Sequence, residues 1–126
     1  CGVRFEFDET LSHKVIAGSD IFMVPSRYEP CGLTQMYALK YGTIPLVRAV
    51  GGLQDTVKEY QPKSGKGSGF KFNGYEKEAL IETVRKALTL YQTKSAWKKL
   101  IKNAFAEDFG WPVTADKYLQ IYRKII

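Results

Sequence analysis

Apolar positions along this chain recur with the period of strands in some segments and with that of helices in others. Residues 20–25 are nearly all apolar, as in a parallel strand buried on both faces. Residues 3–7 alternate apolar and charged side chains, which is typical of a half-buried strand. With two shorter apolar runs, the pattern predicts strands at residues 3–7, 20–25, 43–47 and 69–72.

Helical spacing occupies most of the remaining chain. Apolar residues three and four positions apart predict helices at residues 8–18, 32–41, 53–58, 77–91, 95–106 and 113–125. Asp8 or Thr10 could cap the first helix, whose apolar face would be Leu11, Val15 and Ile16.

The order of these elements is strand then helix, repeated, and then helices alone. That order predicts an α/β fold, a doubly wound parallel sheet followed by C-terminal helices. Gly42 is expected to end the helix before the third strand. Residues 59–68 are rich in Lys, Gly, Ser and Pro, and we expect a mobile loop there.

Composition narrows the class of protein. A chain of 126 residues, 44% of them hydrophobic, suits one folded domain. The net charge of +6 suits phosphate-bearing ligands or anionic polymers, although the lysines of the late helices can equally form a solvated surface. Two cysteines are too few for a disulfide framework. Cys1 is terminal and uninformative, and Cys31 is expected to be a free thiol of a reducing cytosol.

Neither export nor membrane insertion is indicated. The first residues lack a charged region followed by an apolar one, as a signal peptide would have. No apolar run approaches the roughly 18 residues that a membrane span needs. We therefore expect a cytoplasmic protein without a membrane partner.

The segment between the second strand and its helix carries the candidate chemistry. Residues 26–35 read SRYEPCGLTQ, at the carboxyl end of a strand and the mouth of a helix. Open α/β sheets bind ligands at that place, and a helix N-terminus offers N–H groups to an anion. Glu29 can accept hydrogen bonds from ligand hydroxyls. The combination suits a ligand with phosphates and a polyol, such as a nucleotide sugar.

The same segment resembles a known enzyme family. SRYEPCGLTQ (26–35), KYGTIPLVR (40–48) and GGLQDTV (51–57) are similar to bacterial glycogen synthases and plant starch synthases, which are retaining glucosyltransferases of the GT-B architecture. Weaker similarity extends to residues 7–13 and 109–111. The resemblance implies that residues 1–126 are part of the C-terminal, nucleotide-sugar-binding Rossmann-like domain, with residues 112–126 as the C-terminal crossover helix.

The resemblance also implies an activity. Such enzymes transfer glucose from ADP-glucose to the non-reducing end of an α-1,4-glucan, with retention and without a metal or other cofactor. The expected partners are ADP-glucose and the α-glucan acceptor in the full-length enzyme, and the location is the cytoplasm, or the plastid in a plant. Because the acceptor site lies in the other domain, this chain alone is expected to be inactive.

Site residues follow from the same match. Glu29 is expected to be the catalytic and substrate-binding carboxylate, and Cys31, Gly32, Leu33 and Thr34 are expected to line the sugar and the diphosphate. Read without the resemblance, Glu29 is an acid flanking a helix and Cys31 a small buried hydrophobe.

Five further side chains are weaker candidates. Phe7 matches an aromatic residue that lies over adenine, and is otherwise a core aromatic. Tyr37 stands where related enzymes carry a second Glu and is expected in the core. His13 is expected to be structural. Arg27 and Arg48 could reach phosphate, but the family's main phosphate-binding Arg and Lys lie upstream.

The glycine pair Gly51 and Gly52 is expected to be a backbone turn first and a ligand wall second, with Asp55 as its cap or brace.

The last helix presents an apolar face that needs a cover. Tyr118, Leu119, Tyr122 and Ile125 lie along one side of it. The face could repack onto its own domain, but we expect a neighbouring copy to cover it through weak self-association.

Three alternatives remain open at this point. One is another GT-B enzyme, such as a sucrose-type glucosyltransferase or a nucleotide-sugar epimerase. The second is a non-catalytic module that holds nucleotide or glucan. The third, a nucleic-acid binder, rests on charge alone, and since aromatic and basic residues do not interleave we expect no nucleic-acid partner.

Overall fold

The computed structural model describes residues 2–125, so Cys1 and Ile126 lie outside the described residues. Its sheet has three parallel strands in the order β1 (Ile21–Val24), β2 (Ile44–Arg48) and β3 (Phe70–Phe72). In the register of the sheet, Ile21 lies opposite Ile44, and Leu46 lies opposite Phe70. All the carboxyl ends of the strands therefore meet at one edge.

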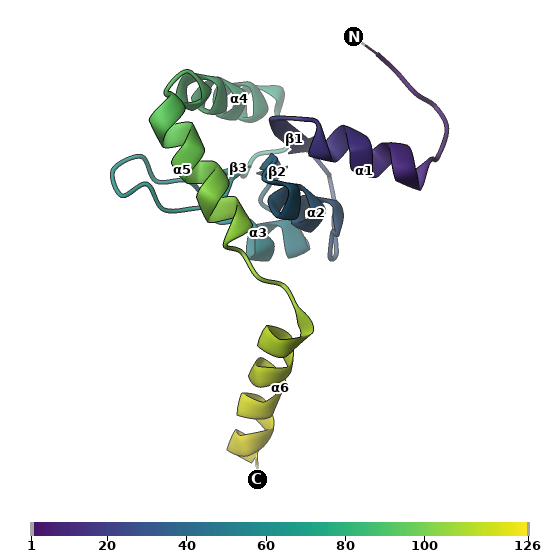
Figure 1. Ribbon diagram of the computed structural model, residues 1–126, viewed down its shortest axis with the longest axis vertical. Helices are drawn as coiled ribbons and strands as arrows, with labels where there is room; N and C mark the ends of the chain where they lie inside the picture. The colour runs from purple at the N-terminus through teal and green to yellow at the C-terminus, as the bar shows by residue number, and fades with distance from the viewer. Residues whose placement is uncertain (1, 126) are drawn as a thin grey trace.

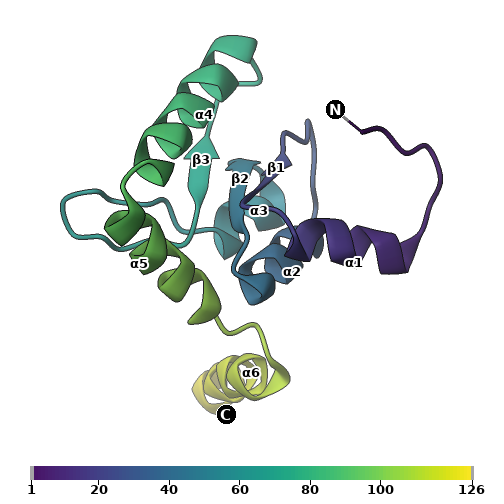
Figure 2. The ribbon, with the colours of Figure 1, turned by 45° about the horizontal axis from the view of Figure 1, so that its top comes forward.

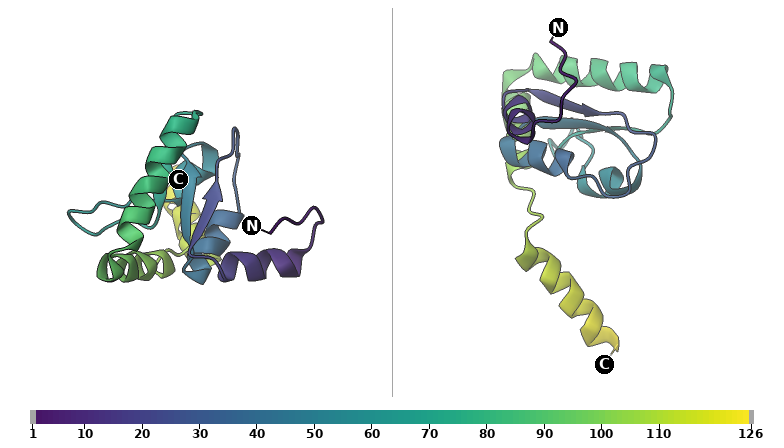
Figure 3. Two further views of the ribbon diagram at one scale, coloured as in Figure 1. Left: turned by 90° about the horizontal axis from the view of Figure 1, so that it is seen from above. Right: turned by 90° about the vertical axis from the view of Figure 1, so that its right-hand side faces the viewer.

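Helices cover both faces of this sheet. The helices of the described residues are α1 (Glu9–Ala17), α2 (Thr34–Tyr41), α3 (Gly51–Thr56), α4 (Lys77–Tyr91), α5 (Lys94–Phe105) and α6 (Trp111–Ile125), of which α6 lies apart from the sheet. The right-hand view of Figure 3 shows α4 along one face, and α2 and α3 on the opposite face. This confirms the predicted doubly wound α/β fold followed by C-terminal helices.

The core is organised around β2. Ile44 and Leu46 are fully buried in a cluster with residues of β3, α4 and α5, while Val47 packs with Leu53 and Val57 on the α3 side. Since successive side chains of a strand point to opposite faces, each face of β2 packs in its own hydrophobic cluster.

The predicted strand at residues 3–7 is wrong. The chain is irregular there until Asp8, and Phe5 and Phe7 are 99% and 96% exposed. An alternating stretch becomes a strand only when a neighbouring strand accepts its backbone hydrogen bonds, and within residues 2–125 no strand pairs with it.

The expected burial of residues 20–25 on both faces is also wrong. None of the side chains in β1 is classed as buried, and Met23 is 44% exposed. The strand itself is present, but it forms an edge of the described sheet, so neighbouring side chains cover it less than they cover β2.

The helix boundaries follow the predicted caps closely. Asp8, rather than Thr10, caps α1 by accepting a hydrogen bond from the backbone N–H of Leu11 at 2.9 Å. Gly42 ends α2 in the left-handed conformation, with φ of 77°. Of the predicted apolar face of α1, Ile16 is buried, but Val15 is 56% exposed.

Residues 59–68 form an organised hairpin rather than an irregular loop. Gln61 pairs with Lys66, and the side chain of Asn103 in α5 donates to the carbonyl oxygens of Gly65 and Gly67, both at 2.8 Å. In Figure 2 this hairpin extends past α5. Its mobility stays a prediction.

Helix α6 stands apart from the sheet and its covering helices, as Figure 1 shows. None of its described residues is buried, and Tyr118 and Tyr122 are 53% and 57% exposed. The helix therefore does not repack onto its own domain, and its covering by a second copy stays a prediction. Among the described residues, no helix combines the length and the apolar character required to cross a membrane.

Candidate functional site

The loop of residues 26–33 joins the carboxyl end of β1 to the start of α2. Its middle lies against the first residues of α3, which itself follows β2. The loop therefore occupies the carboxyl edge of the parallel sheet, where the sequence places a ligand site. Gly32 adopts a positive φ of 69° just before α2, a conformation that favours glycine.

Glu29 lies half-buried in this loop. The hydroxyl of Ser26 donates to its Oε2 at 3.2 Å. Within residues 2–125 the Glu29 side chain makes no other hydrogen bond, so its second carboxylate oxygen is available to a ligand. A hydroxyl group of a ligand would supply the missing donor.

The start of α3 fixes the backbone of the loop. The N–H of Gly52 lies 3.3 Å from the carbonyl oxygen of Glu29 and 3.2 Å from that of Pro30. A Cβ at Gly51 or Gly52 would overlap the carbonyl oxygens of Glu29 and Cys31 respectively. The predicted turn is the first turn of α3, and its glycines permit close backbone approach to the loop.

Gln35 in α2 also holds this loop, a role that sequence reasoning missed. Its fully buried side chain donates through Nε2 to the carbonyl oxygen of Gly32 at 2.9 Å and to the Thr56 hydroxyl at 3.0 Å. Thr56 in turn donates to the carbonyl oxygen of Gly52 at 2.6 Å, so Thr56 is the brace, not Asp55. The available signal was a polar residue on the core-facing side of α2.

Arg48 holds the beginning of the loop. From the end of β2, its Nη1 donates to the carbonyl oxygen of Arg27 at 2.7 Å and lies 3.5 Å from that of Ser26. Its guanidinium lies over the ring of Tyr75, 5.2 Å from the ring centre. The guanidinium of Arg48 thus contacts the chain itself, whereas Arg27 is exposed, and a phosphate contact for either residue stays a prediction.

The start of α2 is open to an anion. Leu33 occupies the N-cap position without a side-chain hydrogen bond, and the first turn holds no acidic residue. The N–H of Gly52 in α3 donates to the loop, whereas the first N–H groups of α2, which starts five residues after Glu29, have no partner within the helix. Cys31, Leu33 and Thr34 are all exposed here, so Cys31 is not a buried hydrophobe.

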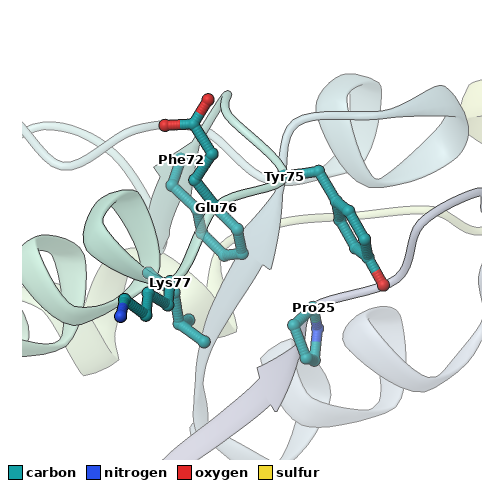
Figure 4. A pocket seen from close by; sticks show the side chains of 6 residues that line it. Pro25, Phe72, Tyr75, Glu76 and Lys77 are labelled. Carbon is teal, nitrogen blue, oxygen red and sulfur yellow. The ribbon is translucent and has the colours of Figure 1, made fainter.

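A small cavity lies beside the loop at the same edge. Its volume is about 290 Å³, and it is lined by residues at and after the ends of β1 and β3, among them Pro25, Phe72 and Tyr75. Figure 4 shows Tyr75 on the same side of the cavity as Pro25, away from Lys77. Since small-molecule pockets span roughly 300–1,000 Å³, this cavity could hold only part of a ligand the size of a nucleotide sugar.

A larger cavity lies away from the loop. It measures about 660 Å³ between α4 and the 59–68 hairpin, and Glu59, Tyr60 and Leu90 are among its lining residues. Burial raises the pKa of the Glu59 carboxyl, and the backbone hydrogen bond from Lys71 opposes part of that rise. This cavity lacks the predicted site residues.

The remaining candidates are Phe7, His13 and Tyr37. Phe7 is 96% exposed, so it is not a core aromatic. His13 is structural, since its Nδ1 lies 2.9 Å from the Tyr41 hydroxyl oxygen and so links α1 to α2. Tyr37 is 39% exposed and its ring packs against His13, so its expected place in the core is wrong. Across residues 2–125, no three His, Cys, Asp or Glu side chains gather in a way that could hold a metal ion.

Known proteins share this sequence and this fold. A family model described as "Glycosyl transferases group 1" matches residues 5–105. The glycogen synthase of Koribacter versatilis is 52% identical over 122 residues, which are 97% of this chain and 25% of that protein. The glycogen synthase of Pseudothermotoga lettingae is 51% identical over 124 residues, covering 98% of this chain and 26% of that protein. The chain thus spans about a quarter of these relatives.

Solved structures agree with these relatives. The catalytic domain of starch synthase IV from Arabidopsis thaliana, bound to ADP and acarbose, matches with a TM-score of 0.83 and 35% identity, over 94% of this chain and 25% of that one. Sucrose-phosphate synthase from Thermosynechococcus elongatus matches with a TM-score of 0.58 and 28% identity, over 88% and 26%. The resemblance predicted from the motif segments is therefore confirmed.

Proposed function

The chain belongs to the glycosyl transferases group 1 family, and on that premise we propose that it forms the donor-binding part of a retaining α-1,4-glucan synthase that uses ADP-glucose. The proposal rests on the 26–33 loop, which carries Glu29 and leads into the start of α2, where no side chain caps the helix. Residues 1–126 would lie within the nucleotide-sugar-binding domain, with residues 112–126 as its crossover helix. The acceptor glucan would bind to the part of the enzyme that this chain does not span.

Glu29 would recognise the transferred sugar. With Ser26 on one carboxylate oxygen, the other can accept hydrogen bonds from glucose hydroxyls. Cys31 and Gly32 would lie beside the glucose, and the backbone N–H groups of Leu33 and Thr34 would face the diphosphate. Contacts that strengthen as charge develops on the departing diphosphate would lower the barrier.

The reaction balances without a protein nucleophile. The bond between glucose C1 and the diphosphate oxygen breaks, and a hydroxyl oxygen of the glucan end bonds to C1 on the same face. The hydroxyl proton passes to the departing diphosphate. The products are ADP and a glucan one glucose longer. In this scheme the chain contributes electrostatic support and position rather than a covalent intermediate.

Phe7 is the proposed contact to the adenine ring. Its exposed side chain precedes α1 and is free to lie over a base. The starch synthase IV structure contains ADP, which favours an adenine nucleotide over a uracil one for this chain.

A second candidate function is a module that binds nucleotide or glucan without catalysis. The loop, α2 and the small cavity could hold an ADP group without completing an active site.

One experiment separates these possibilities. The matching quarter of the Koribacter versatilis glycogen synthase is replaced by this chain, and incorporation of labelled glucose into glycogen is measured with ADP-glucose and with UDP-glucose. We expect transfer from ADP-glucose. A folded chimera that binds ADP but transfers no glucose would support the binding module, and a preference for UDP-glucose would refute the assigned donor.

A further inference from the structure

Arg48 connects the end of β2 to the loop that carries Glu29. Its Nη1 contacts the carbonyl oxygens of Arg27 and Ser26, at 2.7 and 3.5 Å. Ser26 also holds Glu29, since its hydroxyl donates to the carboxylate at 3.2 Å. One residue thus contacts the guanidinium through its backbone and the proposed sugar-binding carboxylate through its side chain.

The charge of Arg48 has no carboxylate partner among residues 2–125. The ion pairs of the described residues join Arg4 to Glu6, Lys58 to Glu107, Lys77 to Glu78 and Lys86 to Glu82. Arg48 instead contacts carbonyl dipoles and the face of Tyr75, and its buried Nε has no hydrogen-bond partner. Removing a guanidinium from water without a carboxylate partner costs free energy, so a contribution to stability alone does not explain Arg48 at this place.

We propose that Arg48 is a positioning residue that fixes residues 26–29 and so holds the Glu29 carboxylate in its donor-binding geometry. This inference rests on the proposed function. The planar guanidinium suits the task because it can direct a donor at two neighbouring carbonyl oxygens while its face lies on an aromatic ring. A direct contact between Arg48 and the diphosphate is the competing role, and the test separates the two.

The first test uses this chain alone. Arg48 contacts the carbonyl oxygen of the Arg27–Tyr28 bond, which is itself a trypsin cleavage site on an exposed residue. Releasing the loop in Arg48→Met should speed cleavage after Arg27 by about fivefold or more, measured by mass spectrometry against cleavage after Lys117 in α6. Cleavage after Arg27 at the wild-type rate would overturn the proposal.

The second test is a double-mutant cycle in the chimera with the Koribacter versatilis synthase. Arg48→Met should lower kcat by about tenfold or more, because small misplacement of a contact is costly. In the Glu29→Gln background the same change should cost less than about twofold, since Arg48 acts through Glu29. Arg48→Lys keeps the charge without the planar fork and should not restore kcat.

The control and the contrary outcomes are distinct. Lys71→Met removes a cation that also donates to a backbone carbonyl, of Gln54 at 3.3 Å, but not in the loop, and it should leave kcat unchanged. Equal losses in both backgrounds, with rescue by Lys and a raised KM for ADP-glucose, would replace positioning by direct phosphate binding. An inactive unsubstituted chimera would refute the proposed function instead, while the trypsin result still decides whether Arg48 holds the loop.

Discussion

Replacing Gly52 with alanine tests whether α3 sets the position of the Glu29 loop. The added Cβ would lie 2.8 Å from the Cα of Cys31 and would overlap its carbonyl oxygen, whereas ordinary contacts begin at 3.4 Å. The atoms in conflict belong to the backbones of α3 and of the loop, so they cannot rotate away as a flexible side chain would. The loop therefore has to retreat from α3.

The magnitude follows from these contacts. Retreat by about 1 Å would weaken the hydrogen bonds from Gly52 N–H to the carbonyl oxygens of Glu29 and Pro30, each with a net contribution of roughly 1 kcal/mol. We expect the free energy of unfolding to fall by about 2 kcal/mol. A misplacement of about 1 Å can cost on the order of a hundredfold in rate, so kcat should fall by at least about tenfold.

The assay is glucose transfer by the chimera, with urea unfolding of the same variants. Gly74→Ala is the matched control, because its Cβ would meet only ordinary contacts, the nearest being Ala79 Cβ at 3.6 Å. The control should keep both activity and stability. A Gly52→Ala variant with a rate within about twofold of the unsubstituted chimera would refute this account of how the loop is held.

Three further outcomes are expected. Burial raises the pKa of Glu59, so the folded state keeps a proton that the unfolded state loses near pH 4.5, and stability declines as pH rises through the folded pKa. Calorimetry should therefore show the Tm of Glu59→Gln rising relative to the wild type between acid and neutral pH. A difference in Tm that does not change with pH would contradict this. The chain alone should incorporate no labelled glucose into glycogen, and measurable incorporation would show that it needs no second domain. Static light scattering should show an average molecular mass that rises with protein concentration, because the apolar face of α6 is uncovered. The double variant Leu119→Lys, Tyr122→Lys should abolish the rise. A constant monomer mass in the unsubstituted chain would refute the self-association.

Local rules placed most elements from the sequence. The apolar runs located β1, β2 and β3, and Asp8 and Gly42 marked helix ends because their caps are local interactions. The 26–33 loop could be placed at the ligand edge since every parallel strand of an α/β sheet ends there.

Contacts between distant segments could not be read in this way. The hydrogen bonds of Gln35 to Thr56 and of Arg48 to Arg27 join residues about twenty positions apart. The residue type alone, Gln or Arg, does not identify such a partner. Residues 3–7 were misassigned for the converse reason, because alternation describes a possible strand and only a pairing neighbour makes one.

The central claim is that Glu29 binds the donor sugar, and Glu29→Gln in the chimera tests it most directly. The amide keeps the size of the side chain but removes its charge and one acceptor. Glu78→Gln, at the exposed start of α4, is the matched control. We predict that Glu29→Gln lowers kcat with ADP-glucose by at least about tenfold at unchanged Tm, while Glu78→Gln does not. A Glu29→Gln chimera that turns over ADP-glucose at the unsubstituted rate would contradict the account.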